Sequence, residues 1–397
     1  MNTHTTHRTP VLPRVLAGLL CLLLPVLAAC GGDNGGNKAK SSPQKEPRVT
    51  VSPADGAQDV RPGDPVTVKV EDGTLAEVAV VGGGKAWPGT LKDSTFTPEA
   101  PLATGTGFQV VVRTEGADGR THEQHSTFHT LTPKQVNKVE VLPGKDTTVG
   151  VGQPVSLAFD HPVKDKAAVE RRLKVTTDNN TEGSWGWVKE PLTERDRVDW
   201  RPKEYWKPGT KVTLEADLNG VDTGDGRYLV RSYNTAFTVG RSQIAKVDLD
   251  THRLTFVQDG KTARTIPVTG GDAQNRTWSG KMTIMSKEGT IWMDSQTVGL
   301  GNAYGQWVQR SMRLTISGTY AHQAEWAEST IGRTNTSHGC LGMTTADATW
   351  FYDRAQAGDV FEVSGGKETV EAGNGFAEWN LSWEDWQARS ALHRAAR

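Results

Sequence analysis

Cys340 is the residue of this sequence best suited to covalent chemistry. The chain has three cysteines; Cys21 lies within an apolar leader and Cys30 ends it, so only Cys340 falls inside the expected folded body, and no internal disulfide is possible there. The thiolate is the nucleophilic form of cysteine, and free Cys has a pKa of about 8.5. A reactive Cys340 therefore needs a nearby base or a positive field.

Two histidines are candidates for that base. His322 ends the segment GTYAH, and His338 lies next to Cys340 in the segment SHGCL. Gly339 removes side-chain bulk beside the sulfur and frees the backbone to point its N–H groups at a developing oxyanion. Zinc binding by the same side chains is disfavoured because His-x-Cys is unlike the usual ligand spacings, so we expect no metal.

The composition excludes some classes of protein and favours a β fold. The 397 residues include 45 Lys and Arg and 46 Asp and Glu, for a net charge of -1. A nucleic-acid binder would usually carry a basic excess, so we expect no nucleic-acid partner. The 43 glycines and 19 prolines suit a turn-rich β protein better than a helical bundle.

Two similar β units precede the region of Cys340. Residues 60–68 (VRPGDPVTV) are echoed by residues 149–157 (VGVGQPVSL), and residues 96–98 (FTP) by residues 200–202 (WRP). Apolar residues alternate with polar ones inside each unit, as expected of strands with one buried face. The pattern predicts two tandem immunoglobulin-like β-sandwiches, over residues 48–132 and 133–241.

The third unit, residues 242–365, is predicted to be mostly β with one main helix. Strands are expected at 246–249, 253–258 and 262–268, with Asp259-Gly260 as a hairpin turn, and at 359–363. The helix should begin near Thr345 and end at Gly358. The N-terminus of this helix would favour a thiolate on Cys340 only over about one turn. The apolar stripe of that helix consists of Ala348, Phe351, Tyr352 and Ala355.

The tail, residues 366–397, is distinguished by its tryptophans. Spacings of four and three residues would place Trp379, Trp383 and Trp386 on one face of a helix. We expect these rings to pack against the body of the protein rather than to form a sugar-binding platform.

The first 30 residues are typical of a targeting segment. The apolar run at 15–26 is well short of a membrane-spanning helix. Its end, LAACG, resembles the lipobox of bacterial lipoproteins, which implies that Cys30 is lipidated and becomes the N-terminus. The alternative is an ordinary secretory signal cleaved near Ala29. Residues 31–47 have the composition of a flexible tether.

Three motifs together resemble the mycobacterial-type L,D-transpeptidases, which have a YkuD-type catalytic domain. The motifs are GTYAH ending at His322, GRTNTSHGCL around Cys340, and WFY followed by GDV at residues 350–360. Such proteins are lipoproteins or anchored proteins. The resemblance spans the mature chain and implies a mainly β protein: two tandem immunoglobulin-like β-sandwich domains, a β-rich catalytic domain at 242–365 with one main helix, and a Trp-bearing C-terminal subdomain at 366–397.

The resemblance implies a peptidoglycan reaction with no cofactor. Cys340 would attack the carbonyl between the third and fourth residues of a donor stem peptide, with His322 as the general base. Release of the terminal D-alanine leaves a thioester, which the side-chain amine of an acceptor stem resolves to a 3→3 cross-link. Carbapenem-type β-lactams would acylate the same thiol. The protein would be lipid-anchored through Cys30 to the outer face of the cytoplasmic membrane and reach into the cell wall.

The remaining site residues follow from the same resemblance. His338 is expected to order the site, and the backbone N–H groups of Gly339 and Cys340 to form the oxyanion hole. Further side chains are expected to shape the loop and contact the substrate; they are Tyr304, which would assist the oxyanion hole, Tyr320, Asn335 and Ser337.

Three departures from the family pattern bear on rate and substrate choice. Gly342 stands where relatives carry Asn or Arg, Gln323 where they often carry Ser, and the segment TWSG at 277–280 where many have Thr-Pro-x-Gly. Two alternative functions stay open at this point. Water could resolve the thioester, giving an L,D-carboxypeptidase, or the protein could be a non-catalytic wall-binding lipoprotein.

Overall fold

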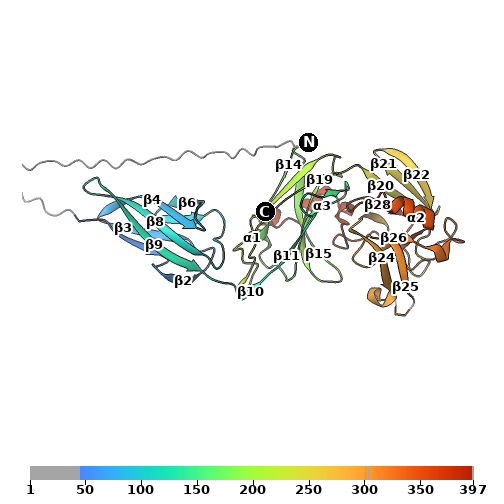
Figure 1. Ribbon diagram of the computed structural model, residues 1–397, viewed down its shortest axis with the longest axis horizontal. Helices are drawn as coiled ribbons and strands as arrows, with labels where there is room; N and C mark the ends of the chain where they lie inside the picture. Colours follow the sequence, from blue (N-terminus) through green and yellow to red (C-terminus); the bar gives the residue numbers. More distant parts are fainter. Residues whose placement is uncertain (1–44, 300, 303, 396–397) are drawn as a thin grey trace, which may run out of the picture. The chain divides into compact units, whose positions relative to one another are not determined.

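A computed structural model describes residues 45–299, 301, 302 and 304–395. The leader with Cys30 and most of the tether lie outside these residues. The described chain forms a first sandwich (residues 48–130), a second sandwich (135–239), a third domain (243–364) and a C-terminal segment (366–395) (Figure 1). None of the helices in these residues is long and apolar enough to cross a membrane.

The first sandwich consists of two mostly antiparallel sheets, in the strand orders β1-β3-β7-β6 and β2-β9-β8-β4-β5. Alternating apolar side chains, among them Val66 and Val68 of β3, point between the sheets and are buried. The strands are β1 (Arg48–Ser52), β2 (Ala57–Val60), β3 (Val66–Glu71), β4 (Gly73–Gly82), β5 (Lys85–Trp87), β6 (Gly89–Lys92), β7 (Thr95–Pro98), β8 (Gly107–Gly116) and β9 (Thr121–Thr130).

The second sandwich repeats this plan with a larger core. Its sheets have the orders β11-β13-β16-β15 and β12-β19-β17-β14, and β10 pairs with β18 in a separate short ladder. Its elements are β10 (Gln135–Val136), β11 (Val139–Leu142), β12 (Thr148–Val149), β13 (Val155–Phe159), α1 (Lys166–Glu170), β14 (Leu173–Thr177), β15 (Gly183–Lys189), β16 (Asp196–Pro202), β17 (Lys211–Ala216), β18 (Arg227–Tyr228) and β19 (Tyr233–Val239). The predicted mainly β fold with two tandem immunoglobulin-like sandwiches is therefore confirmed.

The third domain packs two sheets and one helix around a large apolar core, and two smaller apolar clusters lie beside it, one of which includes Cys340. The sheet orders are β22-β21-β20-β28-β23 and β24-β25-β26-β27. The elements are β20 (Gln243–Asp248), β21 (Arg253–Gln258), β22 (Lys261–Pro267), β23 (Gly280–Thr283), β24 (Ser286–Asp294), η1 (Ser295–Val298), β25 (Gly305–Arg313), β26 (Tyr320–Gln323), η2 (Glu325–Ala327), β27 (Leu341–Met343), α2 (Thr345–Tyr352) and β28 (Val360–Ser364).

Local sequence signals in the third domain have mixed outcomes. Asp259 and Gly260 both have positive φ, at 48° and 78°, as a two-residue hairpin turn between β21 and β22 requires. Thr344 caps α2, since its side chain accepts from the Asp347 N–H. The predicted stop at Gly358 is wrong, because α2 ends at Tyr352 and the chain continues in turns to β28. Ala355 still packs into the core from outside the helix.

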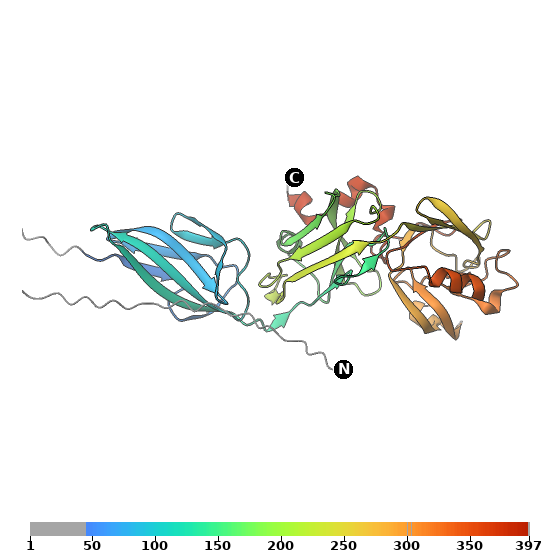
Figure 2. The same ribbon diagram turned by 45° about the horizontal axis from the view of Figure 1, so that its top comes forward.

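The C-terminal segment lies against the second sandwich, where both views show its red helices beside green strands (Figures 1 and 2). It contains η3 (Glu378–Asn380), α3 (Trp383–Gln387) and α4 (Ala391–Ala395). The single helical face predicted for the tryptophans is wrong, because Leu381 is extended between η3 and α3. The predicted packing is confirmed: the rings of Trp379, Trp383 and Trp386 lie 5.1, 5.5 and 5.3 Å from the buried Arg201 guanidinium.

Candidate active site

Strand pairing brings His322 and Cys340 together. Strands β26 and β27 are parallel neighbours, with His322 opposite Gly342. Cys340 directly precedes β27 and therefore lies beside the start of β26. Both side chains line a cavity of about 430 Å³, whose other walls include Thr269, Met293, Tyr304, Gln306, Ala324, Trp326, Ala327, Thr330, Thr336, Ser337, His338 and Gly342.

The His322 imidazole is held as a neutral base. Its Nδ1 lies 2.6 Å from the Gln323 carbonyl oxygen. That oxygen can only accept, so Nδ1 carries the proton and Nε2 is left as an acceptor. Burial lowers the pKa of His322 below its ordinary value. The Gln323 carbonyl therefore orients the ring.

Trp326 was not anticipated from the sequence as part of the site. Its ring stacks on that of His322, with centroids 5.9 Å apart. The other side of Trp326 is open, since 51% of the residue is exposed. No periodicity or motif marks this residue, because it follows β26 in the irregular chain around η2.

The Cys340 thiol is a buried neutral group. Only 8% of the residue is exposed, and its Sγ donates to the Gly318 carbonyl at 3.7 Å. Burial raises the pKa of Cys340 to about 11, and the backbone N–H of Tyr320 offsets part of that rise. Helix α2 begins only after β27, so no helix N-terminus adjoins the sulfur. The resting pair is therefore a neutral thiol and a neutral imidazole near pH 7.

Tyr304 and His338 are in ring contact and line the same cavity as Cys340. Their ring centroids are 5.0 Å apart. Burial and then the charge of a Cys340 thiolate raise the pKa of Tyr304, so its hydroxyl keeps its proton. The backbone of Tyr304 is fixed by Ser295, whose Oγ accepts from the Tyr304 N–H at 3.1 Å.

The loop before Cys340 is closed by Ser337. The Ser337 hydroxyl donates to the Cys340 carbonyl at 2.7 Å and accepts from the Gly339 N–H at 3.1 Å. Gly339 has a φ of 113°, a conformation that favours glycine. The Gly339 N–H, expected in the oxyanion hole, is thus already donated to Ser337 in this structure.

Asn335 and Tyr320 have anchoring contacts. Asn335 accepts from the Gly270 N–H at 2.8 Å and donates to the Leu249 carbonyl at 2.9 Å. These bonds fit the expected loop-shaping role, but Asn335 is not among the residues lining the cavities around Cys340. The Tyr320 hydroxyl donates to Glu288 at 3.1 Å, and 5% of the residue is exposed.

Three cavities meet at Tyr304. Besides the cavity that contains His322, a second one of about 320 Å³ adjoins Tyr320 and Gly318, and a third of about 440 Å³ adjoins His338, Gly339 and Gly318. Substrate groups can therefore approach the region of the thiol from more than one side.

Gly342, the departure from the family pattern, is enclosed by its neighbours. It exchanges backbone hydrogen bonds with Thr269, at 2.8 and 3.0 Å. A Cβ at this position would lie 2.8 Å from Thr269 Cγ2 and 2.9 Å from Ala324 Cβ. The floor of the cavity is therefore built for glycine, and a larger residue would require its neighbours to shift.

Comparisons with known protein families agree with the fold and with the site. A bacterial Ig domain matches residues 57–222, and an L,D-transpeptidase catalytic domain matches residues 242–363. The chain belongs to the L,D-transpeptidase family. Among the described residues, no group of three or more His, Cys, Asp or Glu side chains is arranged to hold a metal ion.

Two relatives from Mycobacterium tuberculosis match most of the chain. L,D-transpeptidase 2 is 35% identical over 358 residues, which are 87% of this chain and 85% of the relative. L,D-transpeptidase 5 is 33% identical over 374 residues, which are 92% of this chain and 82% of the relative. A solved structure of LD transpeptidase LdtMt1 in complex with imipenem is 32% identical, with a TM-score of 0.50, and covers 58% of this chain and 100% of its own.

Proposed function

We propose that this protein forms 3→3 cross-links in peptidoglycan through a thioester on Cys340. The observation that carries the proposal is the placement of His322 on β26 and of Cys340 directly before the adjoining parallel strand β27, so that both line one cavity. His322 presents an unprotonated Nε2, and Cys340 is the sole cysteine of the described chain. The reaction uses only groups of the protein and of its two substrates.

In the first half-reaction, the Cys340 sulfur attacks the carbonyl carbon between the third and fourth residues of a tetrapeptide stem. His322 takes the thiol proton as the carbon–sulfur bond forms. The tetrahedral intermediate collapses by breaking the peptide bond, and His322 returns the proton to the nitrogen of the departing D-alanine. Because thiol and imidazole both begin neutral, this proton transfer accompanies attack rather than preceding it.

In the second half-reaction, the side-chain amine of an acceptor stem attacks the thioester. His322 accepts a proton from that amine, the carbon–sulfur bond breaks, and the sulfur recovers a proton as thiol. The cross-linked amide replaces the peptide bond that was lost, so the exchange is balanced. Cavities on more than one side of Tyr304 give the two stems separate approaches.

The surrounding residues have supporting roles in this proposal. The Cys340 N–H and the Tyr304 hydroxyl donate to the oxyanion. The Gly339 N–H joins them only by releasing Ser337, which otherwise shapes the loop with Asn335. His338 orders Tyr304 by ring contact. Tyr320 borders the cavity beside Gly318, where a stem peptide would pass.

The test follows products by mass spectrometry. The chain from Lys45, which is one compact unit, is incubated with purified disaccharide-tetrapeptide beside a Cys340→Ala control. We expect a dimer lighter than two substrates by one D-alanine, absent from the control. Tripeptide alone would identify an L,D-carboxypeptidase. No product, with a Cys340 thiol inert to a carbapenem, would favour a wall-binding protein.

We also propose that the protein is anchored outside the cytoplasmic membrane by a lipid on Cys30. The support is the leader and its LAACG end. Cys30 lies outside the described residues. Mass spectrometry of the N-terminal peptide from membrane-extracted protein should show a diacylglyceryl cysteine, and Cys30→Ala should abolish it. A free N-terminus produced by cleavage near Ala29 would contradict the anchor.

A further inference from the structure

The loop between β25 and β26, residues 314–319, holds the Cys340 thiol. The Gly318 carbonyl accepts from Sγ at 3.7 Å, and the adjoining Tyr320 N–H also bonds the sulfur. The loop closes through the Leu314 N–H, which donates to the Thr319 carbonyl at 2.9 Å. Any displacement of this loop therefore moves two hydrogen-bond partners of the thiol.

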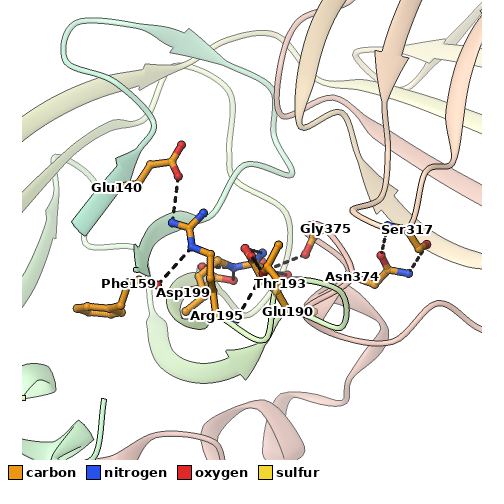
Figure 3. A network of polar contacts seen from close by, with 11 residues as sticks. Glu140, Phe159, Glu190, Thr193, Arg195, Asp199, Ser317, Asn374 and Gly375 are labelled. Carbon is orange, nitrogen blue, oxygen red and sulfur yellow. Dashed lines mark hydrogen bonds and ion pairs between the residues drawn. The ribbon is translucent and has the colours of Figure 1, made fainter. Parts of the chain in front are cut away.

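Asn374 clamps that loop from the C-terminal segment (Figure 3). Its Oδ1 accepts from the Ser317 N–H at 2.9 Å, and its Nδ2 donates to the Ser317 Oγ at 2.8 Å. Asn374 is only 4% exposed. Ser317 precedes Gly318, so the clamp acts one residue away from the carbonyl that holds the sulfur.

The glycines on either side of Asn374 let the chain pass closely between the third domain and the second sandwich; we call residues 373–375 the wedge. Gly373 and Gly375 have φ values of 97° and 81°, which favour glycine. A Cβ on Gly375 would lie 2.7 Å from the Leu314 carbonyl oxygen of the loop. A Cβ on Gly373 would lie 2.5 Å from the Lys189 carbonyl oxygen of β15. The segment 373–375 therefore has backbone contact with the loop on one side and with the second sandwich on the other.

Arg197 of β16 fixes the wedge from the second sandwich. Its Nη2 donates to the Gly375 carbonyl at 2.7 Å. Figure 3 shows Gly375 beside Asn374. The guanidinium is itself held by Asp199, at 2.9 Å, and by Glu190, at 3.4 Å. All of these groups are buried, so the contact is shielded from water and from screening ions.

We propose that Asn374 is a positioning residue for Cys340, and that Arg197 carries this positioning from the second immunoglobulin-like sandwich. The contacts run from Arg197 through Gly375 and Asn374 to Ser317, and from Gly318 to the thiol. The inference rests on the proposed role of Cys340 as the nucleophile. It assigns the second sandwich a part in the reaction beyond spacing the third domain from the membrane.

The test compares two asparagines of the C-terminal segment. Asn380 is the matched control, because its side chain clamps Lys281 of β23 in the same two-point way, at 2.7 and 2.8 Å, without touching residues 314–319. Asn374→Leu and Asn380→Leu are made in the chain from Lys45. Each is acylated with imipenem, and the rate constant at saturation and the half-saturating concentration are measured separately.

We expect Asn374→Leu to lower the saturated acylation rate about tenfold or more, with a half-saturating concentration within about threefold of wild type. Asn374→Asp, which keeps an acceptor for the Ser317 N–H, should recover part of the rate. Asn380→Leu should acylate as wild type even where its melting temperature falls equally. Equal rates in Asn374→Leu and wild type, or an equal loss in Asn380→Leu, would overturn the inference.

Alkylation of Cys340 by iodoacetamide provides a readout that does not depend on transpeptidation. Releasing the loop admits water to the sulfur, so alkylation at pH 8 should rise about fivefold or more in Asn374→Leu but not in Asn380→Leu. If imipenem does not acylate the wild-type protein, the proposed function fails. The alkylation rates still test whether Asn374 positions Cys340. Should Asn374→Leu not fold, Ser317→Ala should show both effects at smaller size, and its behaving as wild type would overturn the inference.

Discussion

The two sandwiches are built on one plan but differ in what covers their outer faces. In β7 of the first sandwich, Phe96 is buried while Thr97 is exposed. In β16, the matching strand of the second sandwich, all seven residues are buried. Inward residues such as Trp200 fill the sandwich core, and the outward side chains are covered by the C-terminal segment.

Because the C-terminal segment covers the outer face of β16, the polar residues on that face form buried ion pairs instead of solvent-exposed ones. The outward residues of β16 are Arg197, Asp199 and Arg201, and they are joined in buried ion pairs and cation–π contacts. Glu378 completes this cluster, and burial raises its pKa to about 8. In the first sandwich, Arg113 makes its ion pairs in water. The same sheet position is therefore partly exposed to solvent in the first sandwich and is covered by the C-terminal segment in the second.

Removing one charge from each sandwich should give the largest difference. Arg197→Met leaves Asp199 and Glu190 buried without their partner and should cost about 3–5 kcal/mol of unfolding free energy. Arg113→Met removes solvent-exposed pairs with Glu77 and Glu123, which water and salt screen, and should leave the unfolding free energy near that of wild type. Denaturant unfolding of both variants, followed by tryptophan fluorescence, checks the pair. Similar losses in the two variants would contradict the comparison.

Matching glycines test the covered face without changing charge. In the second sandwich, a Cβ on Gly152 would meet Val360 Cγ2 at 2.5 Å, whereas a Cβ on the equivalent Gly63 would have no atom within 4 Å. Gly152→Ala should destabilise by about 1–3 kcal/mol through overpacking. Gly63→Ala should stay within about 0.5 kcal/mol of wild type. Thermal unfolding measures both, and an unaffected Gly152→Ala protein would argue against a tight contact with the third domain.

The pH dependence of stability should have opposite signs at two aspartates. Hydrogen bonds from Thr127 lower the pKa of Asp55 in the first sandwich, so its contribution is present above the ordinary carboxyl range and is lost as the pH falls. Burial raises the pKa of Asp359 to about 7, so folding retains a proton that the unfolded chain releases. The contribution of Asp359 to the stability of the fold should therefore fall as the pH rises from about 4 to about 7.

Asparagine substitutions separate these two contributions. The melting temperature of Asp359→Asn, relative to that of wild type, should rise between pH 5 and pH 8. The melting temperature of Asp55→Asn should lie below that of wild type at neutral pH, and the difference between the two should shrink toward pH 3. Melting curves across this range are the measurement. A difference in melting temperature between Asp359→Asn and wild type that does not change with pH would contradict the prediction.

The smallest effect is expected at the floor of the cavity. Gly342→Asn should keep acylation of Cys340 by a carbapenem and slow it by less than about tenfold, because Thr269 and Ala324 must shift to admit the new side chain. Thr269→Ser removes the methyl group in the way and should restore part of the rate. Intact-mass kinetics follow the acyl-enzyme. Complete loss of acylation in Gly342→Asn would show that this loop is wrongly matched to the family.

Short-range signals in the sequence predicted much of the fold. Alternation predicted the sandwich strands, Asp259-Gly260 predicted a hairpin, and the helix start was predicted near Thr345, because each signal depends on neighbouring residues. The helix end and the shape of the tail were mispredicted. Ala355 packs in the core although α2 has ended, and the three tryptophans meet around Arg201 from two short elements rather than one helix.

The sequence by itself determined the chemical groups of the site: one thiol, two nearby histidines, and a glycine beside the sulfur. Only the tertiary structure decided their state and support. Burial favours the neutral forms of the thiol and of His322, Trp326 stacks on the imidazole, and Asn374 contacts the loop beside Cys340 from the C-terminal segment. Burial and hydrogen bonding between distant segments depend on which surfaces meet in three dimensions, and no local spacing encodes that meeting.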